Sequence, residues 1–167
     1  MKYLLQTFLL VFIISCDDGD LQIETIDFDA ITTIQFCNTL TADTAETLFK
    51  INDNQALILQ LPADFLKNET TTETLTISIP ENTQLLYRTF SSTVNDTYFC
   101  STIPVISPIV NEEITAINGS VTVDTKLLDS NTYEHEIQLQ DISFVSETGI
   151  RITDLSVQNF GTVITSP

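Results

Sequence analysis

The chain has 167 residues and a formal net charge of −17, from 23 acidic and 6 basic side chains. Nucleic acid is excluded as a partner, because binding a polyanion requires clustered Lys or Arg and the basic residues here are scattered. The acidity also predicts repulsion from anionic lipid headgroups. A chain of this length with 43% hydrophobic residues is typical of a single globular domain.

The first fifteen residues have the layout of a secretion signal. Lys2 precedes an apolar stretch over residues 4–14, which is too short for a membrane-spanning helix of ~20 residues. A small residue and Cys16 end the stretch, and this pattern resembles the lipobox of bacterial lipoproteins. The resemblance implies that residues 1–15 are cleaved and that Cys16 becomes a lipidated N-terminus attached to the membrane. A transmembrane anchor or a buried helix is the alternative.

Three carboxylates follow the cysteine at Asp17, Asp18 and Asp20. They resemble the acidic export signal that sends lipoproteins of the Bacteroidota to the outer face of the outer membrane, so residues 16–22 are expected to form a lipidated acidic tether. The alternative is a calcium loop, which would need a bidentate Glu where Phe28 stands. Without the export signal the domain would face the periplasm. The chain also resembles uncharacterised flavobacterial surface lipoproteins, and that resemblance implies no activity.

Residues 23–167 read as one domain built from short strands. Ile, Val, Leu, Phe and Thr alternate with polar residues at a period of two, which is typical of half-buried strands. The predicted strands are 23–29, 31–37, 49–51, 56–61, 75–79, 85–90, 97–103, 114–117, 120–125, 133–145, 150–157 and 160–165.

Turn residues separate these strands. Residues 52–55 predict one hairpin, and Asn118-Gly119 is the preferred dipeptide for a second. The proline-rich segment 104–108 is interpreted as a crossing between two sheets.

Helical signals are limited to one or two turns in residues 41–49 and 62–67. Many short strands without alternating helices predict an all-β fold, an antiparallel β-sandwich of immunoglobulin-like or jelly-roll kind. A closed up-and-down barrel is the alternative.

Two cysteines remain once Cys16 carries lipid. Cys37 and Cys100 both lie in apolar surroundings, and an even pair in an exported protein predicts a disulfide between them. Two unpaired buried thiols are the alternative. A redox or zinc site is disfavoured, because the chain has no Cys-x-x-Cys motif and only one histidine.

That histidine, His135, lies between Glu134 and Glu136 in a predicted strand. The period of two places His135 on the core face, satisfied by a hydrogen bond, and both glutamates on the other face. In glycosidases, the two catalytic carboxylates lie ~5–9.5 Å apart across a cleft. Two glutamates on one exposed strand face are instead expected to be solvated surface residues without a catalytic role.

The sequence therefore predicts a non-enzymatic, lipid-anchored binding or accessory protein of the cell envelope, without cofactor or metal. Its expected partners are the membrane, through Cys16, and another envelope protein or an extracellular glycan or polypeptide. The alternatives are a small carboxylate-dependent hydrolase of glycosidase type and a calcium-stabilised adhesion module. Asp43-Thr44-Ala45 also resembles the O-glycosylation motif of exported Bacteroidota proteins, which implies a glycan on Thr44.

Overall fold

A computed structural model describes residues 26–167 with the exception of residues 27, 29, 147–148, 150 and 153–157. The predicted signal peptide, the lipidation residue Cys16 and the tether 16–22 lie outside the described residues. The export signal of Asp17, Asp18 and Asp20 lies outside them as well.

The described part of the chain contains eight strands and one short helix, so the prediction of an all-β protein is confirmed. Every pairing between two of these strands is antiparallel. The elements are β1 (Glu46–Asn52), β2 (Gln55–Leu61), β3 (Leu75–Ile79), β4 (Gln84–Phe90), α1 (Asp96–Cys100), β5 (Val110–Asp129), β6 (Thr132–Val145), β7 (Arg151–Ile152) and β8 (Asn159–Thr165).

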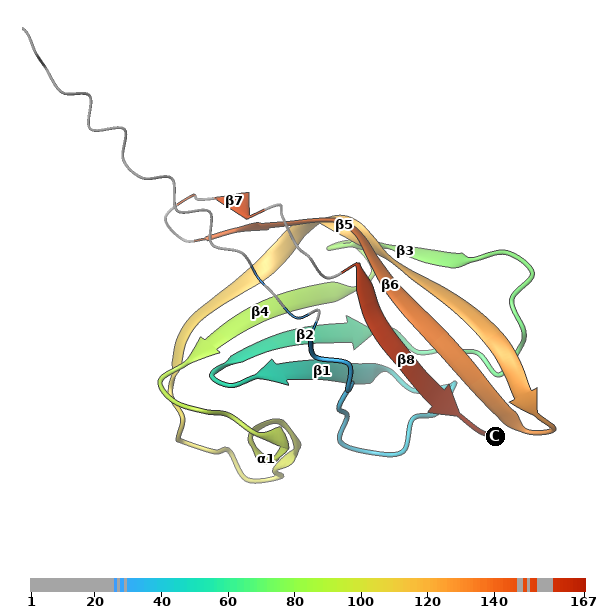
Figure 1. Cartoon of the computed structure of the whole chain (residues 1–167), viewed down its shortest axis with the longest axis horizontal. Helices are drawn as coiled ribbons and strands as arrows, with labels where there is room; N and C mark the ends of the chain where they lie inside the picture. The colour runs from blue at the N-terminus through green and yellow to red at the C-terminus, as the bar shows by residue number, and fades with distance from the viewer. Residues whose placement is uncertain (1–25, 27, 29, 147–148, 150, 153–157) are drawn as a thin grey trace, which may run out of the picture.

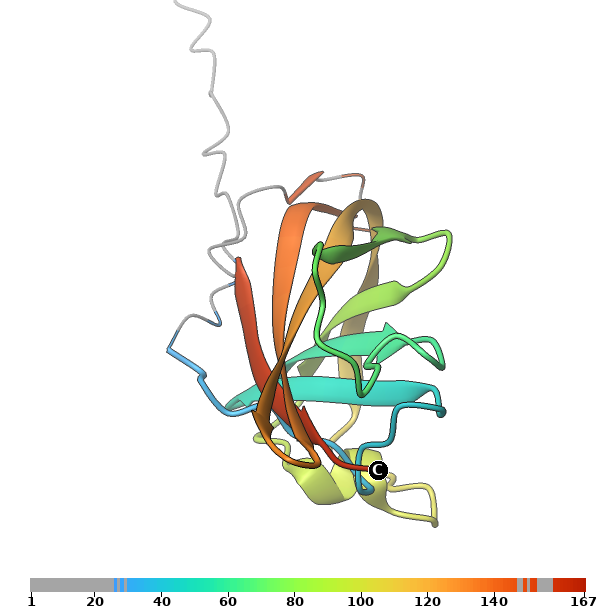
Figure 2. The same ribbon diagram turned by 90° about the vertical axis from the view of Figure 1, so that its right-hand side faces the viewer.

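The strands form one connected sheet that curls into a half-barrel (Figure 1). The path runs β1-β2-β4-β5-β6-β7, with β3 added to β5 and β8 added to β6. Two separate sheets were expected, but the 20-residue strand β5 belongs to both halves: it pairs with β4 near its start and with β3 farther along. The described strands do not form the closed barrel either. Closure would require the end strand β1 to pair with a strand from the other end of the sheet, and among the described strands β1 pairs with β2, while β8 pairs with β6. The curl lets the two halves cross and face each other (Figure 2).

The predicted hairpin at Asn118-Gly119 is wrong, because β5 continues through it. The register of β5 against β6 shifts on both sides of Asn118, which is the signature of a bulge that bends the strand. Gly119 has a φ of 129°, a conformation that other residues rarely adopt. The chain instead reverses at residues 130–131, between Asp129 and Thr132. The Asn-Gly pair therefore makes a corner of the half-barrel.

Replacing Gly119 by Ala is expected to lower the free energy of unfolding by about 2–4 kcal/mol, through backbone strain and steric overlap together. A Cβ at this position would lie 2.6 Å from Ile142 Cδ1 and 2.9 Å from the Gln140 carbonyl oxygen. Gly149→Ala is the matched control, because Gly149 also has a positive φ, of 84°, and a Cβ there meets nothing within 4 Å. Urea unfolding of both variants separates overlap from strain. Equal losses would contradict the role of the overlap.

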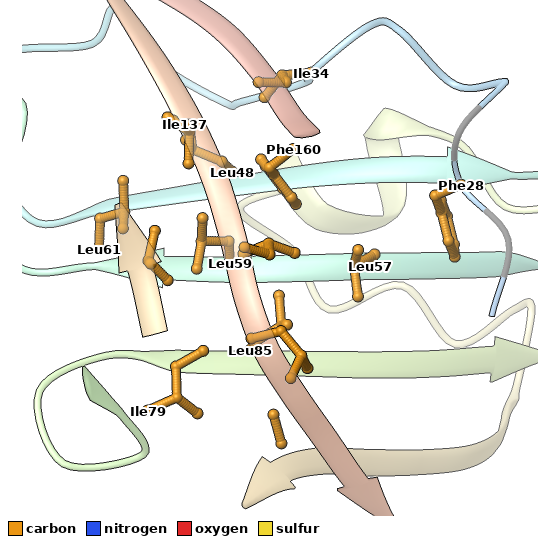
Figure 3. Close-up of a cluster of buried hydrophobic side chains, with 14 of the residues drawn as sticks. Phe28, Ile34, Leu48, Leu57, Leu59, Leu61, Ile79, Leu85, Ile137 and Phe160 are labelled. Atoms are coloured by element: carbon orange, nitrogen blue, oxygen red, sulfur yellow. The ribbon is translucent and has the colours of Figure 1, made fainter. Parts of the chain in front are cut away.

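The core fills the space between the two halves of the curled sheet. In Figure 3, β6 crosses over β1, β2 and β4, with side chains from both sides meeting between them. Alternate residues of each strand point into this space, as the period of two predicts. The N-terminal segment contributes too, since Phe28 is fully buried in the same cluster. The residues labelled there are Phe28, Ile34, Leu48, Leu57, Leu59, Leu61, Ile79, Leu85, Ile137 and Phe160.

Four other local predictions differ from the structure. The helical turns expected in 41–49 and 62–67 are absent, and residues 46–49 are the start of β1. The strand expected at 97–103 is instead the end of helix α1 and a loop. The strand expected at 31–37 contributes only the bridge of Gln35 to Phe49 in β1.

Candidate binding surface

Helix α1 packs against a second apolar cluster, on the face of β1, β2 and β4 that points away from the main core. Neighbouring strand residues divide between the two faces: Leu48 enters the main core, whereas Phe49 enters the second cluster. This second cluster explains why β2 is buried at four consecutive positions. Its members are Phe49, Ala56, Ile58, Leu86, Phe90 and Val94, with Ile51, Tyr98, Phe99, Cys100 and Val110 packed against them.

Aromatic contacts fix the orientation of α1 on this face. Phe99 stacks on Phe49 with ring centroids 4.4 Å apart and an interplanar angle of 28°. Tyr98 meets Phe90 edge to face at 4.9 Å and 76°. Such pairs stabilise by about 0.5–1.5 kcal/mol beyond the area that they bury. A five-residue helix would not persist alone, so its conformation depends on this packing.

A disulfide joins α1 to the N-terminal part of the domain. Cys37, which follows the bridge of Gln35 to Phe49, is bonded to Cys100, with the two Cα atoms 5.0 Å apart. The bond spans a sequence separation of 63 residues. The structure thus brings together the two cysteines that the sequence paired, although Cys100 lies on a helix and not on a strand.

The loop that follows α1, residues 101–109, is apolar and exposed, and we call it the apolar loop. Ile103, Ile106 and Ile109 are 75%, 89% and 66% exposed. The surrounding stretch 97–111 contains no charged residue, in a chain with a net charge of −17. Large exposed apolar side chains that gather in one place mark interaction sites. Sequence analysis missed this surface, although the uncharged stretch was the available signal.

Hydrogen bonds hold the C-terminal end of the apolar loop against the end of β4. The Ser91 amide donates to the Ile109 carbonyl at 2.8 Å, and the Ile109 amide donates to Ser91 Oγ at 3.0 Å. The loop returns the chain to β5, which pairs with β4. The interpretation of residues 104–108 as a crossing between two sheets is therefore wrong.

A hollow of about 370 Å³ lies between the apolar loop and the residues that lead into α1. None of its lining residues is charged. The lining consists of Ser92, Thr93, Asn95, Thr97, Tyr98, Val105, Ser107 and Pro108.

The chain matches no protein-family model, no curated protein and no solved structure. The function of this surface therefore rests on its own geometry.

A second hollow, of about 360 Å³, lies beside β8 and is lined by Lys50. Lys50 is only 2% exposed, and its Nζ lies 3.5 Å from the Asn159 carbonyl oxygen and 5.5 Å from the centroid of the Phe160 ring. Sequence analysis did not single out this lysine, because its burial depends on the approach of β8 to β1.

His135 lies on the core face, as predicted, within a chain of buried polar side chains. Its Nδ1 is 2.8 Å from Thr125 Oγ1 and its Nε2 is 2.7 Å from Thr165 Oγ1. Thr165 donates its proton to Asn68 Oδ1, so it accepts from Nε2, and Nδ1 accepts from Thr125. Burial lowers the pKa of His135 from 6.5 to about 4. The imidazole is thus a neutral structural link between β5, β6 and β8.

Glu134 and Glu136 each have a partner on the outer face of β6. Glu134 forms an ion pair with Lys126 of β5, which raises the pKa of that lysine, and Glu136 accepts a hydrogen bond from Gln138 at 3.0 Å. Neither glutamate lines the hollows described above. The structure does not place this pair across a cleft, which the glycosidase reading requires.

Among the described residues, no three His, Cys, Asp or Glu side chains gather as metal ligands. No described helix has the length and apolar character that crossing a bilayer demands. Thr44 is exposed, and its Oγ1 donates to Glu46 Oε1 at 2.6 Å.

Proposed function

We propose that the protein is a lipid-anchored binding protein of the cell envelope, without catalytic activity, held through Cys16 in the outer membrane with its domain on the cell surface. The signal-like residues 1–15 and the cysteine that follows them support the anchor. Acyl chains on Cys16 would anchor stably, because each buried methylene contributes about 0.8 kcal/mol. The acidic residues Asp17, Asp18 and Asp20 support export to the surface.

The apolar loop is the observation that carries the binding role. Three isoleucines stand in solvent, on a base fixed by a disulfide and by hydrogen bonds to Ser91. Because both ends of the loop are held, a partner that covers it pays for less conformational entropy than one that binds a loop free at either end. The partner is an envelope protein or an extracellular glycan or polypeptide.

One experiment on intact cells tests the anchor and the surface together. The wild-type protein is expected to incorporate radiolabelled palmitate, to be removed from intact cells by protease, and to crosslink to a neighbouring protein. Cys16→Ser should abolish palmitate incorporation. Ile106→Asp should reduce the crosslinked product at least tenfold, because it places a charge in the contact.

Leu128→Asp is the matched control, since Leu128 is also an exposed apolar residue, at the end of β5. It should leave the crosslinked product unchanged. A full-length protein in the cytoplasm with a free Cys16 thiol contradicts the proposal. If the protein is lipidated but protease added to intact cells does not remove it, the domain faces the periplasm instead.

A further inference from the structure

We infer that the hollow between residues 92–98 and the apolar loop binds a neutral saccharide. The inference rests on the proposed function and deepens it by naming the class of ligand. The volume of about 370 Å³ falls within the range of small-molecule sites, which is ~300–1,000 Å³. Three properties of the lining indicate this class of ligand: its hydrogen-bonding groups, its charge and its apolar wall.

The hollow presents hydrogen-bonding groups that suit hydroxyl groups on a ligand. In the part of the chain that the structure describes, the side chains of Ser92, Asn95 and Ser107 make no hydrogen bond to the protein. Hydroxyl and amide groups can both donate and accept, as can each hydroxyl of a sugar. A saccharide would therefore meet groups able to pair with it from several sides.

The charge of the surroundings disfavours an ionic ligand. The net charge of −17 repels an anion. A cation would require carboxylates that converge on it, whereas the two carboxylates that contact the lining each accept a hydrogen bond from a lining threonine. Asp53 accepts from Thr93 Oγ1 at 2.7 Å, and Asp96 accepts from the Thr97 amide at 2.8 Å. A neutral polar ligand is not repelled by the net charge and does not require free carboxylates.

An apolar wall completes the site. Val105 and Pro108 line the hollow on the side of the apolar loop, and Tyr98 lines it from α1. The aliphatic face of a sugar ring can pack on such groups while its hydroxyls reach the polar ones. The Tyr98 ring is held by Phe90 at 4.9 Å and by Phe99 at 5.3 Å, so this wall is formed before the ligand arrives.

The test measures binding of the purified mature protein, lipidated at Cys16 and kept in detergent, to an array of neutral, acidic and amino-bearing glycans. A neutral glycan retained on the array is then titrated by calorimetry, with and without EDTA. Neutral glycans should be retained, with an affinity that EDTA does not change. Asn95→Ala and Ser92→Ala should each weaken binding at least tenfold, because each removes a pairing group.

Asn131→Ala and Ser130→Ala are the matched controls, since both residues are exposed in the turn between β5 and β6. They should bind as the wild type does, and thermal melting checks that all four variants are folded. The inference is overturned if no glycan is retained, if the retained glycans are charged, or if Asn95→Ala binds normally. Palmitate incorporation and removal by protease from intact cells are measured separately from glycan binding. A lipidated surface protein that binds no glycan therefore overturns this inference and leaves the proposed anchor and location intact.

Discussion

Reduction of the Cys37–Cys100 disulfide is expected to lower the free energy of unfolding by about 4 kcal/mol. The bond spans 63 residues, and the entropy that it removes from the unfolded chain grows with the length of the closed loop. Denaturant unfolding of the Cys16→Ser protein, with and without dithiothreitol, measures the difference without interference from the third thiol.

The double variant Cys37→Ser/Cys100→Ser is the control for this experiment. Its free energy of unfolding should equal that of the reduced protein and should not change with dithiothreitol. Alkylation before reduction should modify neither cysteine of the oxidised protein. Identical unfolding curves in both redox states would mean that the bond contributes nothing. Reduction should also weaken saccharide binding, because Cys100 belongs to the same short helix as Tyr98, which lines the hollow.

Acidification to pH 4 is expected to lower the free energy of unfolding of the wild-type protein by about 3 kcal/mol through His135 alone. The imidazole has a pKa of about 4 in the folded protein and 6.5 as its ordinary value. Between these values the unfolded chain binds a proton that the folded chain does not, so stability falls as the pH falls. The contribution is fully present above pH 6.5 and is lost as the pH falls to about 4.

His135→Gln isolates this effect, because an amide keeps a donor and an acceptor for Thr125 and Thr165 but does not titrate. Unfolding measured from pH 7.5 to pH 4 should show a smaller loss for the variant. Carboxylates titrate in both proteins, so the difference between the two curves reports the histidine. The chain has one histidine, which allows its titration to be followed directly by NMR. A titration near pH 6.5 would contradict the burial argument.

Local patterns predicted the strands well where the side chains alternate over a continuous stretch. Residues 75–79 were expected as a strand and form β3, and residues 133–145 lie within β6. The same alternation placed His135 in the core, because the direction of a strand side chain follows from its position alone. These properties depend on near neighbours, so they can be read along the chain.

Local turn and propensity signals failed where distant segments supplied a stronger interaction. Asn118-Gly119 suits a hairpin turn, but strands β3, β4 and β6 all pair with β5 around it and extend the strand through the corner. Residues 97–100 have the composition of a strand, yet they form a helix because aromatic contacts and the disulfide hold them on the outer face of β1 and β4.

The sequence by itself determined the all-β class and the cysteine pairing, and it supplies the expectation of a lipidated Cys16. Only the tertiary structure decided that the strands curl into one half-barrel, that Lys50 is buried, and that three isoleucines of the apolar loop remain in solvent. The physical reason is that strand periodicity and residue type are local properties. Whether an apolar side chain is covered depends on segments far away in the chain.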